Sequence, residues 1–294
     1  MNRTSTFSYT RRRVLGVLVL AAALATGAAG AEVILTIDDA GFLSGAAERV
    51  RRVDLVQLTQ ALSRAGLDPP PRVHVILIPE HDPRARATPA WIVGRAFEPQ
   101  DVVIFPERAA SYPYDSLEAI VQHEIVHLAL SARADGRTLP RWFHEGVAVS
   151  VAAGWGVTGQ LRLLFAASGR LPVREVARLF QSDSQPGAAQ AYMLAAALVD
   201  DLRRRHGAAV PGAVARRVAG GAPFEQALAL ETGETVDEAT ARAWSFYLGW
   251  TSWILFLTGT NAVWTAILAL ACIAFLVQVR RRFRRRRQWD EEGY

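Results

Sequence analysis

The 294-residue chain contains no lysine, a single cysteine, Cys272, and only two methionines, Met1 and Met193. One cysteine cannot form a disulfide within the chain, so we expect no disulfide to stabilise the folded part. The chain also lacks internal repeats, and its 37 residues from 243 to 279 carry no charge. These absences exclude a disulfide-rich scaffold and a repeat protein.

The net positive charge of the chain is concentrated at its two ends. The formal charge is +5 and the sequence pI is about 9.9. Residues 1–31 carry four arginines, and residues 280–294 carry seven arginines and three acidic residues, so each end has a charge of +4 and the segment between them −3. Because this segment has no basic patch interleaved with aromatic residues, we expect no nucleic-acid partner.

The N-terminus has the three regions of a secretory signal peptide. Arg11–Arg13 is followed by the apolar run Val14–Ala25 and by the small residues Ala29–Ala31, which places cleavage before Glu32. The arginine run faintly resembles a twin-arginine export signal, although an ordinary signal is preferred, and an uncleaved membrane anchor is the alternative. In either case residues 1–31 are predicted to deliver the following chain outside the cytoplasm.

The C-terminal part has the features of a membrane anchor. An apolar span is predicted near Trp253–Val277, and the arginine-rich run Arg280–Arg287 is predicted to stop it on the cytoplasmic side. The polar residues Thr258–Asn261 interrupt this span; one tilted helix is preferred over two shorter segments. The predicted organisation is a signal peptide (1–31), an extracytoplasmic domain (32–247), a transmembrane segment (248–279) and a cytoplasmic basic tail (280–294). The protein is thus expected in the cell membrane as a single-pass protein, bound to the membrane through this C-terminal helix.

The motif His123-Glu124-x-x-His127 lies on a predicted helix from residue 115 to 132, with Asp115 as N-cap and Glu118 completing a capping box. Two histidines four residues apart lie on one face of a helix, where both can bind one metal ion. Glu124 is rotated by about 100° from His123, which places its carboxylate beside the metal. This is the position of a general base for a metal-bound water.

A second motif follows, Trp142-Phe143-His144-Glu145-Gly146-Val147-Ala148. After a polar turn at Asp135–Gly136, Pro140 is predicted to start a second helix, with Glu145 in its first turn. Glu145 could then supply a third metal ligand. His144 points to a different side of this helix and is expected to lie behind a ligand or on the surface.

These two motifs resemble those of zincin metallopeptidases whose third ligand is Glu, the gluzincins. The second motif resembles the Trp-Leu-x-Glu-Gly-x-Ala signature of that group, which includes the aminopeptidase N-like family. The chain is most similar to the bacterial peptidase MA family of metallohydrolases, over roughly residues 73–244. The resemblance implies a Zn²⁺ ion bound by His123, His127 and Glu145, with Glu124 as the catalytic base. It also implies that Tyr192 stabilises the oxyanion, although a core role for Tyr192 is equally compatible with the sequence and Tyr112 and Tyr114 are alternatives.

The expected fold is α+β and zincin-like. It has a small N-terminal mixed sheet, an active-site helix and a helical C-terminal lobe, followed by one C-terminal transmembrane helix. A helix is predicted over residues 45–65 and strands over 73–78, 91–96 and 102–105. The resemblance implies that the edge strand pairs with an extended peptide substrate.

The function that follows is a membrane-anchored, extracytoplasmic zinc peptidase acting on a peptide or protein substrate. Met1 and Met193 lie in no Gly-x-Met-Glu-Asn loop of the kind that holds a free amino terminus in aminopeptidases, so an endopeptidase is favoured. The alternative is a non-catalytic, zinc-stabilised envelope domain for binding or assembly. Glu124 argues against that alternative, because a purely structural site needs no base.

Overall fold

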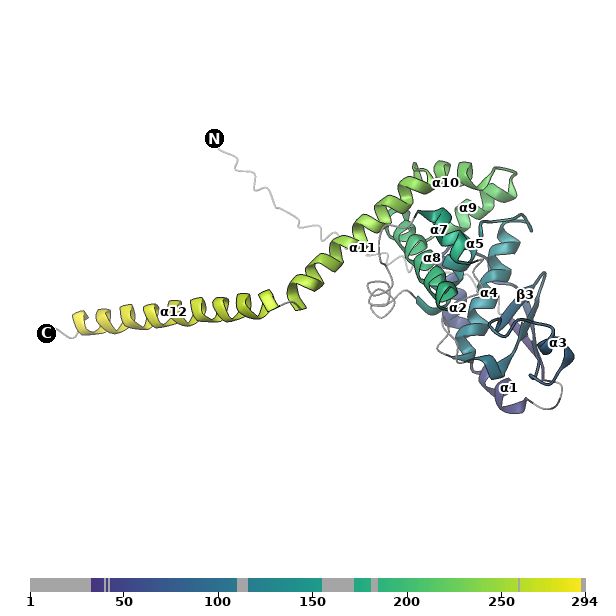
Figure 1. Cartoon of the computed structure of the whole chain (residues 1–294), viewed down its shortest axis with the longest axis horizontal. Coiled ribbons are helices and arrows are strands. Elements are labelled where there is room, and N and C mark those ends of the chain that lie inside the picture. Colours follow the sequence, from purple (N-terminus) through teal and green to yellow (C-terminus); the bar gives the residue numbers. More distant parts are fainter. Residues whose placement is uncertain are drawn as a thin grey trace, which may run out of the picture. The chain divides into compact units, whose positions relative to one another are not determined.

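The computed structural model describes residues 33–39, 41, 43–109, 116–154, 172–180, 185–258 and 260–291. Within these residues a four-stranded sheet and a set of helices form a mixed α+β architecture (Figure 1). The predicted signal peptide and Tyr112, Tyr114 and Asp115 lie outside the described residues.

The sheet has the strand order β1-β2-β4-β3, with β1 at Ile34–Asp38, β2 at Arg72–Leu77, β4 at Asp101–Ile104 and β3 at Gly94–Phe97. β1, β2 and β4 are parallel, and β3 is antiparallel to β4. Alternate residues of β2 are buried, as a strand with one face on the core requires. The mixed sheet expected from the sequence is therefore present, with β3 at one edge.

Two details of the sheet differ from the sequence-based expectation. β1 was missing from the predicted strands, although three of its five residues, Ile34, Leu35 and Ile37, are apolar. It is an edge strand, and its Ile34 is 51% exposed. The strand predicted over residues 91–96 begins only at Gly94, after a turn.

The helix predicted over residues 45–65 is in fact two helices, α1 (Ser44–Arg51) and α2 (Leu55–Arg64). Asp54 breaks the run, because its backbone leaves the helical region and its side chain accepts a hydrogen bond of 2.8 Å from the amide of Gln57. An aspartate in this position caps the start of a new helix. The amphipathic pattern continues across the break and therefore does not reveal it.

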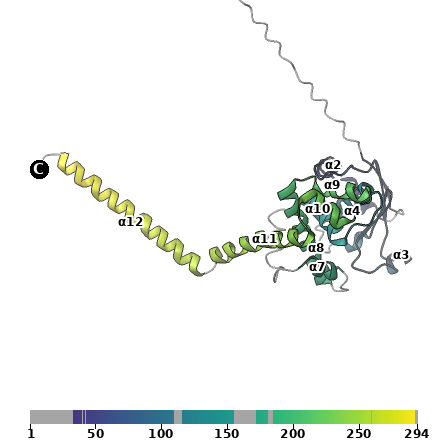
Figure 2. The ribbon, with the colours of Figure 1, turned by 90° about the horizontal axis from the view of Figure 1, so that it is seen from above.

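The metal-motif helix is α4 (Leu117–Arg133). Its N-cap is Ser116 instead of the predicted Asp115, since the Ser116 Oγ accepts a hydrogen bond of 3.1 Å from the amide of Ala119. Glu118 in the first turn forms a two-point ion pair with Arg49 of α1, at 3.1 and 2.8 Å. α4 contacts β3, β4, α5 and α9. Figure 1 shows it between β3 and α5, and Figure 2 shows α9 beside it.

The remaining helices form the lobe that the sequence predicts after α4. They are α5 (Arg141–Val149), the π-helix η2 (Ser150–Gly154), α7 (Val173–Leu179), α8 (Gln185–His206), α9 (Val210–Ala219) and α10 (Phe224–Thr232); the short helices α3 (Pro83–Arg86) and η1 (Pro106–Arg108) belong to the sheet side. Trp142 and Phe143 of α5 pack against Phe224 of α10, with ring centroids 5.8 and 5.0 Å apart. Gly146 lets α5 approach α8, because a Cβ at this position would lie 2.4 Å from the carbonyl oxygen of Ala195.

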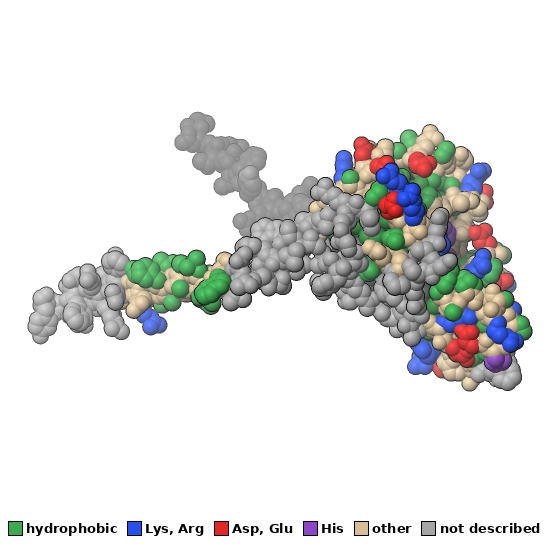
Figure 3. Space-filling model, in the orientation of Figure 1, with side chains coloured by type: hydrophobic (Ala, Val, Ile, Leu, Met, Phe, Trp, Pro, Cys, Tyr) green, Lys and Arg blue, Asp and Glu red, His purple; other side chains and the backbone are tan. Residues whose placement is uncertain are grey.

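The predicted C-terminal transmembrane helix is wrong. Two helices, α11 (Val236–Thr258) and α12 (Thr260–Glu291), divide the uncharged run between them. None of the helices in the described part of the chain is long and apolar enough to cross a bilayer. α12 carries exposed apolar side chains such as Trp264, Leu268 and Phe275 (Figure 3), but the same helix continues through the arginines to Glu291. Residues 280–291 of the predicted charged tail thus belong to the same helix.

Candidate metal centre

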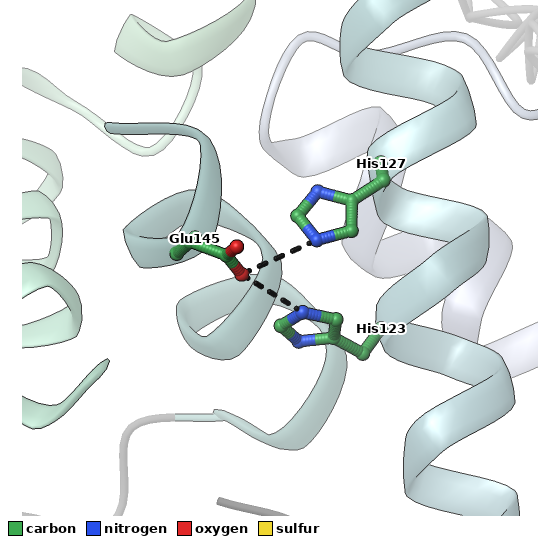
Figure 4. A group of neighbouring side chains, drawn as sticks. All are labelled: His123, His127 and Glu145. Atoms are coloured by element: carbon green, nitrogen blue, oxygen red, sulfur yellow. Dashed lines mark hydrogen bonds and ion pairs between the residues drawn. The ribbon is translucent and has the colours of Figure 1, made fainter. Parts of the chain in front are cut away.

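Two helices bring together the three side chains that the sequence singles out as metal ligands. α4 presents His123 and His127 one turn apart on its buried side, and α5 presents Glu145 opposite them (Figure 4). The chain returns between the helices through Asp135 and Gly136, whose φ angles of 53° and 67° lie in the left-handed region. Glu145 is the fifth residue of α5, so it lies just after the first turn and not within it as predicted.

The distances among these three side chains suit a metal ion. The Glu145 Oε2 lies 3.3 Å from the His123 Nε2 and 3.4 Å from the His127 Nε2. One ligand atom from each residue lies within 4.8 Å of the other two. Zinc bonds of about 2.0–2.1 Å at a tetrahedral angle place two donor atoms about 3.3 Å apart. The group could therefore hold a metal ion.

His123 and Glu145 have the charge that metal binding requires, whereas His127, whose pKa is raised, must release a proton when a metal binds. Burial and the neighbouring His127 lower the pKa of His123 to about 4, so His123 is neutral at neutral pH. Burial alone would raise the pKa of Glu145, but hydrogen bonds with both histidines hold it well below its usual range. Burial opposes protonation of His127, whereas its interactions with Glu145 outweigh this and raise its pKa. A neutral imidazole and an ionised carboxylate are the forms in which these side chains bind metals.

Glu124 is buried against the edge strand β3. Its side chain is 4% exposed, and a Cβ built on Gly94 of β3 would lie 2.8 Å from the Glu124 Oε1. Burial raises the pKa of Glu124 to about 7, although a hydrogen bond from the backbone of Ala96 opposes this rise. A carboxyl group with a pKa near neutrality can both accept and release a proton at physiological pH.

Three further polar residues lie around the centre, Arg141, His144 and Ser131. The sequence motifs do not say which side chains these residues contact. Arg141 forms an ion pair with the Glu145 carboxylate, with Nε and Oε1 3.7 Å apart, and donates a hydrogen bond of 2.9 Å to the carbonyl of Phe180. His144 lies behind His127, with its Nδ1 2.6 Å from the His127 Nδ1, and its Nε2 lies 3.3 Å from the Ser131 Oγ. The sequence offers two signals for these contacts. Arg141 and Glu145 are four positions apart on one helix, and His144, next to Glu145 in the sequence, was expected behind a ligand or on the surface.

Tyr192 lies on α8 beside the centre. Its ring centroid is 6.3 Å from that of His123, and its ring packs edge-on against Phe180 at 5.3 Å. Burial raises the pKa of Tyr192, so its hydroxyl keeps its proton and can donate a hydrogen bond. The two tyrosines that compete with it in the sequence, Tyr112 and Tyr114, lie outside the described residues.

Comparison with known proteins gives no family for this chain: no protein-family model matches it, and no curated protein matches it significantly. The resemblance to gluzincins is therefore carried by the two motifs alone. What the structure adds is that these motifs meet in one group of side chains that could hold a metal.

Proposed function

We propose that this protein is a zinc-dependent endopeptidase. The observation that carries the proposal is the convergence of His123, His127 and Glu145 on one point, with the buried carboxylate of Glu124 on the same helix as the two histidines. Two histidines and one glutamate are the ligand set of zinc hydrolases, in which the fourth position stays open for water or substrate. A structural zinc site is usually closed by a fourth protein ligand, and the described residues offer only three.

In this proposal the side chains around the centre have different catalytic roles. A zinc ion held by His123, His127 and Glu145 would supply Lewis acidity to a peptide carbonyl and to water. Glu124 accepts the proton of the attacking water and returns it to the leaving amine, for which a pKa of about 7 is well suited. Tyr192 keeps its proton and donates a hydrogen bond to the charge that develops on the carbonyl oxygen.

The edge strand β3 supports a peptide as the substrate. β3 pairs only with β4 among the described strands, so its outer backbone groups face away from the sheet. An extended peptide can add to such an edge through backbone hydrogen bonds. Because Glu124 lies against the same strand, a peptide bound there would pass beside the proposed base. Met193 lies on α8 and in no loop that could hold a free amino terminus, which favours cleavage within a chain.

The proposal is tested with the full-length protein and a mixture of unstructured peptides. Mass spectrometry should detect internal cleavage that stops when a chelator removes the metal and returns when one equivalent of zinc is added. Cleavage that persists in the metal-free protein would refute a zinc mechanism. Stoichiometric zinc binding without any cleavage would instead favour the alternative function, a zinc-stabilised binding domain.

Gly94→Ala tests whether the backbone of β3 positions Glu124. The added methyl group would lie 2.8 Å from the Glu124 Oε1 and 2.9 Å from the Ile120 Cγ2, so the flexible carboxylate should be displaced. Displacement of a catalytic group by about 1 Å can cost on the order of 10²-fold in rate, and we expect kcat to fall by about that factor while zinc content is unchanged. Steady-state kinetics and metal analysis measure both quantities.

Gly45→Ala is the matched control, since a Cβ at Gly45 would meet no atom within 4 Å. This variant should retain the wild-type rate. A Gly94→Ala protein with unchanged kcat would show that β3 does not determine the position of Glu124.

A further inference from the structure

The two ring nitrogens of His127 face two neighbouring side chains of α5. Its Nε2 lies 3.4 Å from the Glu145 Oε2, on the side where the metal is proposed to bind. Its Nδ1 lies 2.6 Å from the Nδ1 of His144, and the two rings are inclined by only 26°. The consecutive residues His144 and Glu145 thus lie on opposite sides of one imidazole.

This arrangement determines where the protons of both histidines lie. If His127 binds a metal through Nε2, its proton must be on Nδ1, which then donates to His144. The Nδ1 of His144 must accept this hydrogen bond, so the proton of His144 is on its Nε2. The nearest partner of that nitrogen is the Oγ of Ser131, at 3.3 Å, one turn after His127 on α4. The hydrogen bonds run in one direction, from His127 to His144 to Ser131.

We propose that His144 is a positioning residue that fixes the tautomer and ring orientation of His127, and that Ser131 fixes the tautomer of His144 in turn. The inference rests on the metal site of the proposed function. Metal-binding histidines usually donate their second N–H to a carboxylate, a backbone carbonyl or water. The neutral imidazole of His144 orients the His127 ring without adding a negative charge next to the metal.

The geometry argues against two other roles for His144. It is not a fourth ligand, because its Nδ1 lies against the Nδ1 of His127, on the side of that ring away from Glu145, and the ligand group contains only His123, His127 and Glu145. It is not simply a packing residue either, because both of its nitrogens have a polar partner at hydrogen-bond distance.

The test compares three variants of the full-length protein by their affinity for zinc, measured in competition with a chromogenic chelator. His144→Phe keeps a ring and removes both hydrogen bonds. His144→Asn places its amide oxygen near the former Nδ1 and can still accept from His127, whereas His144→Gln places its amide near the former Nε2 and can reach only Ser131. We expect the Phe and Gln variants to bind zinc about 10–100-fold more weakly than wild type, and the Asn variant to keep most of the affinity.

Two outcomes of this series would overturn the inference. Wild-type affinity in His144→Phe would show that His127 needs no partner, and equal weakening by Phe, Asn and Gln would show that His144 acts through packing. Thermal unfolding of the metal-free proteins shows whether each variant is folded.

A second measurement needs no variant. In a long-range proton–nitrogen correlation spectrum of the zinc-bound wild type labelled at histidine, His127 should carry its proton on Nδ1 and His144 on Nε2. The opposite tautomers would overturn the inference. Because neither experiment measures peptide cleavage, a protein that binds zinc but cleaves nothing would refute the peptidase and leave the role of His144 to be decided by these results.

Discussion

Replacing Glu124 with Gln is expected to lower kcat for peptide cleavage by about 10²–10⁴-fold, the usual contribution of a general base. The zinc content should not change, because Glu124 is not among the residues that could bind the metal. The fold should also survive, since burial already raises the pKa of Glu124 to about 7 and the neutral amide has the same shape. The amide oxygen can still accept the hydrogen bond from Ala96, but the side chain can no longer take a proton.

Glu118→Gln is the matched control for this prediction. Glu118 lies on the same helix, but its carboxylate pairs with Arg49 at 2.8 Å, and the substitution should leave kcat unchanged. Steady-state kinetics and zinc analysis of the two variants distinguish the loss of a general base from the effect of removing a negative charge from α4. A Glu124→Gln protein that cleaves peptides at the wild-type rate would exclude Glu124 as the base and favour the binding-domain alternative.

Replacing His127 with Ala is expected to abolish both stoichiometric zinc binding and cleavage. The substitution removes one of three ligands, and the remaining pair, His123 and Glu145, cannot hold zinc with comparable affinity. It also removes the group that contacts His144 at 2.6 Å. Elemental analysis of the purified protein measures zinc per chain. Thermal unfolding with and without added zinc provides a second readout, because a ligand that binds only the native state raises its stability.

His74→Ala is the control for this second prediction. His74 lies on β2, where its Nδ1 contacts the Asp101 carboxylate at 3.3 Å, away from the ligand group. The His74→Ala variant should bind one zinc ion per chain, like the wild type. If His127→Ala also retained one zinc ion, the metal would have to be bound elsewhere in the chain.

Features that depend on residues close together in the sequence could be predicted without the structure. The His123–His127 pair lies on a helix as predicted, because a spacing of four residues and an apolar face are local properties. The strand at Arg72–Leu77 and the turn at Asp135–Gly136 follow from alternation and from glycine in the same way. The sequence alone therefore determined which residues to consider as metal ligands and on which kind of element they lie.

Features that depend on contacts between distant segments were decided only by the tertiary structure. The order of the strands in the sheet, with β4 between β2 and the antiparallel edge strand β3, depends on such contacts and has no local signal. The convergence of Glu145 on the two histidines depends on how α5 packs against α4, and the contact of His144 with His127 depends on the same packing. Local patterns identify the surface that a helix buries, but the partner on that surface is chosen by the packing of the whole core.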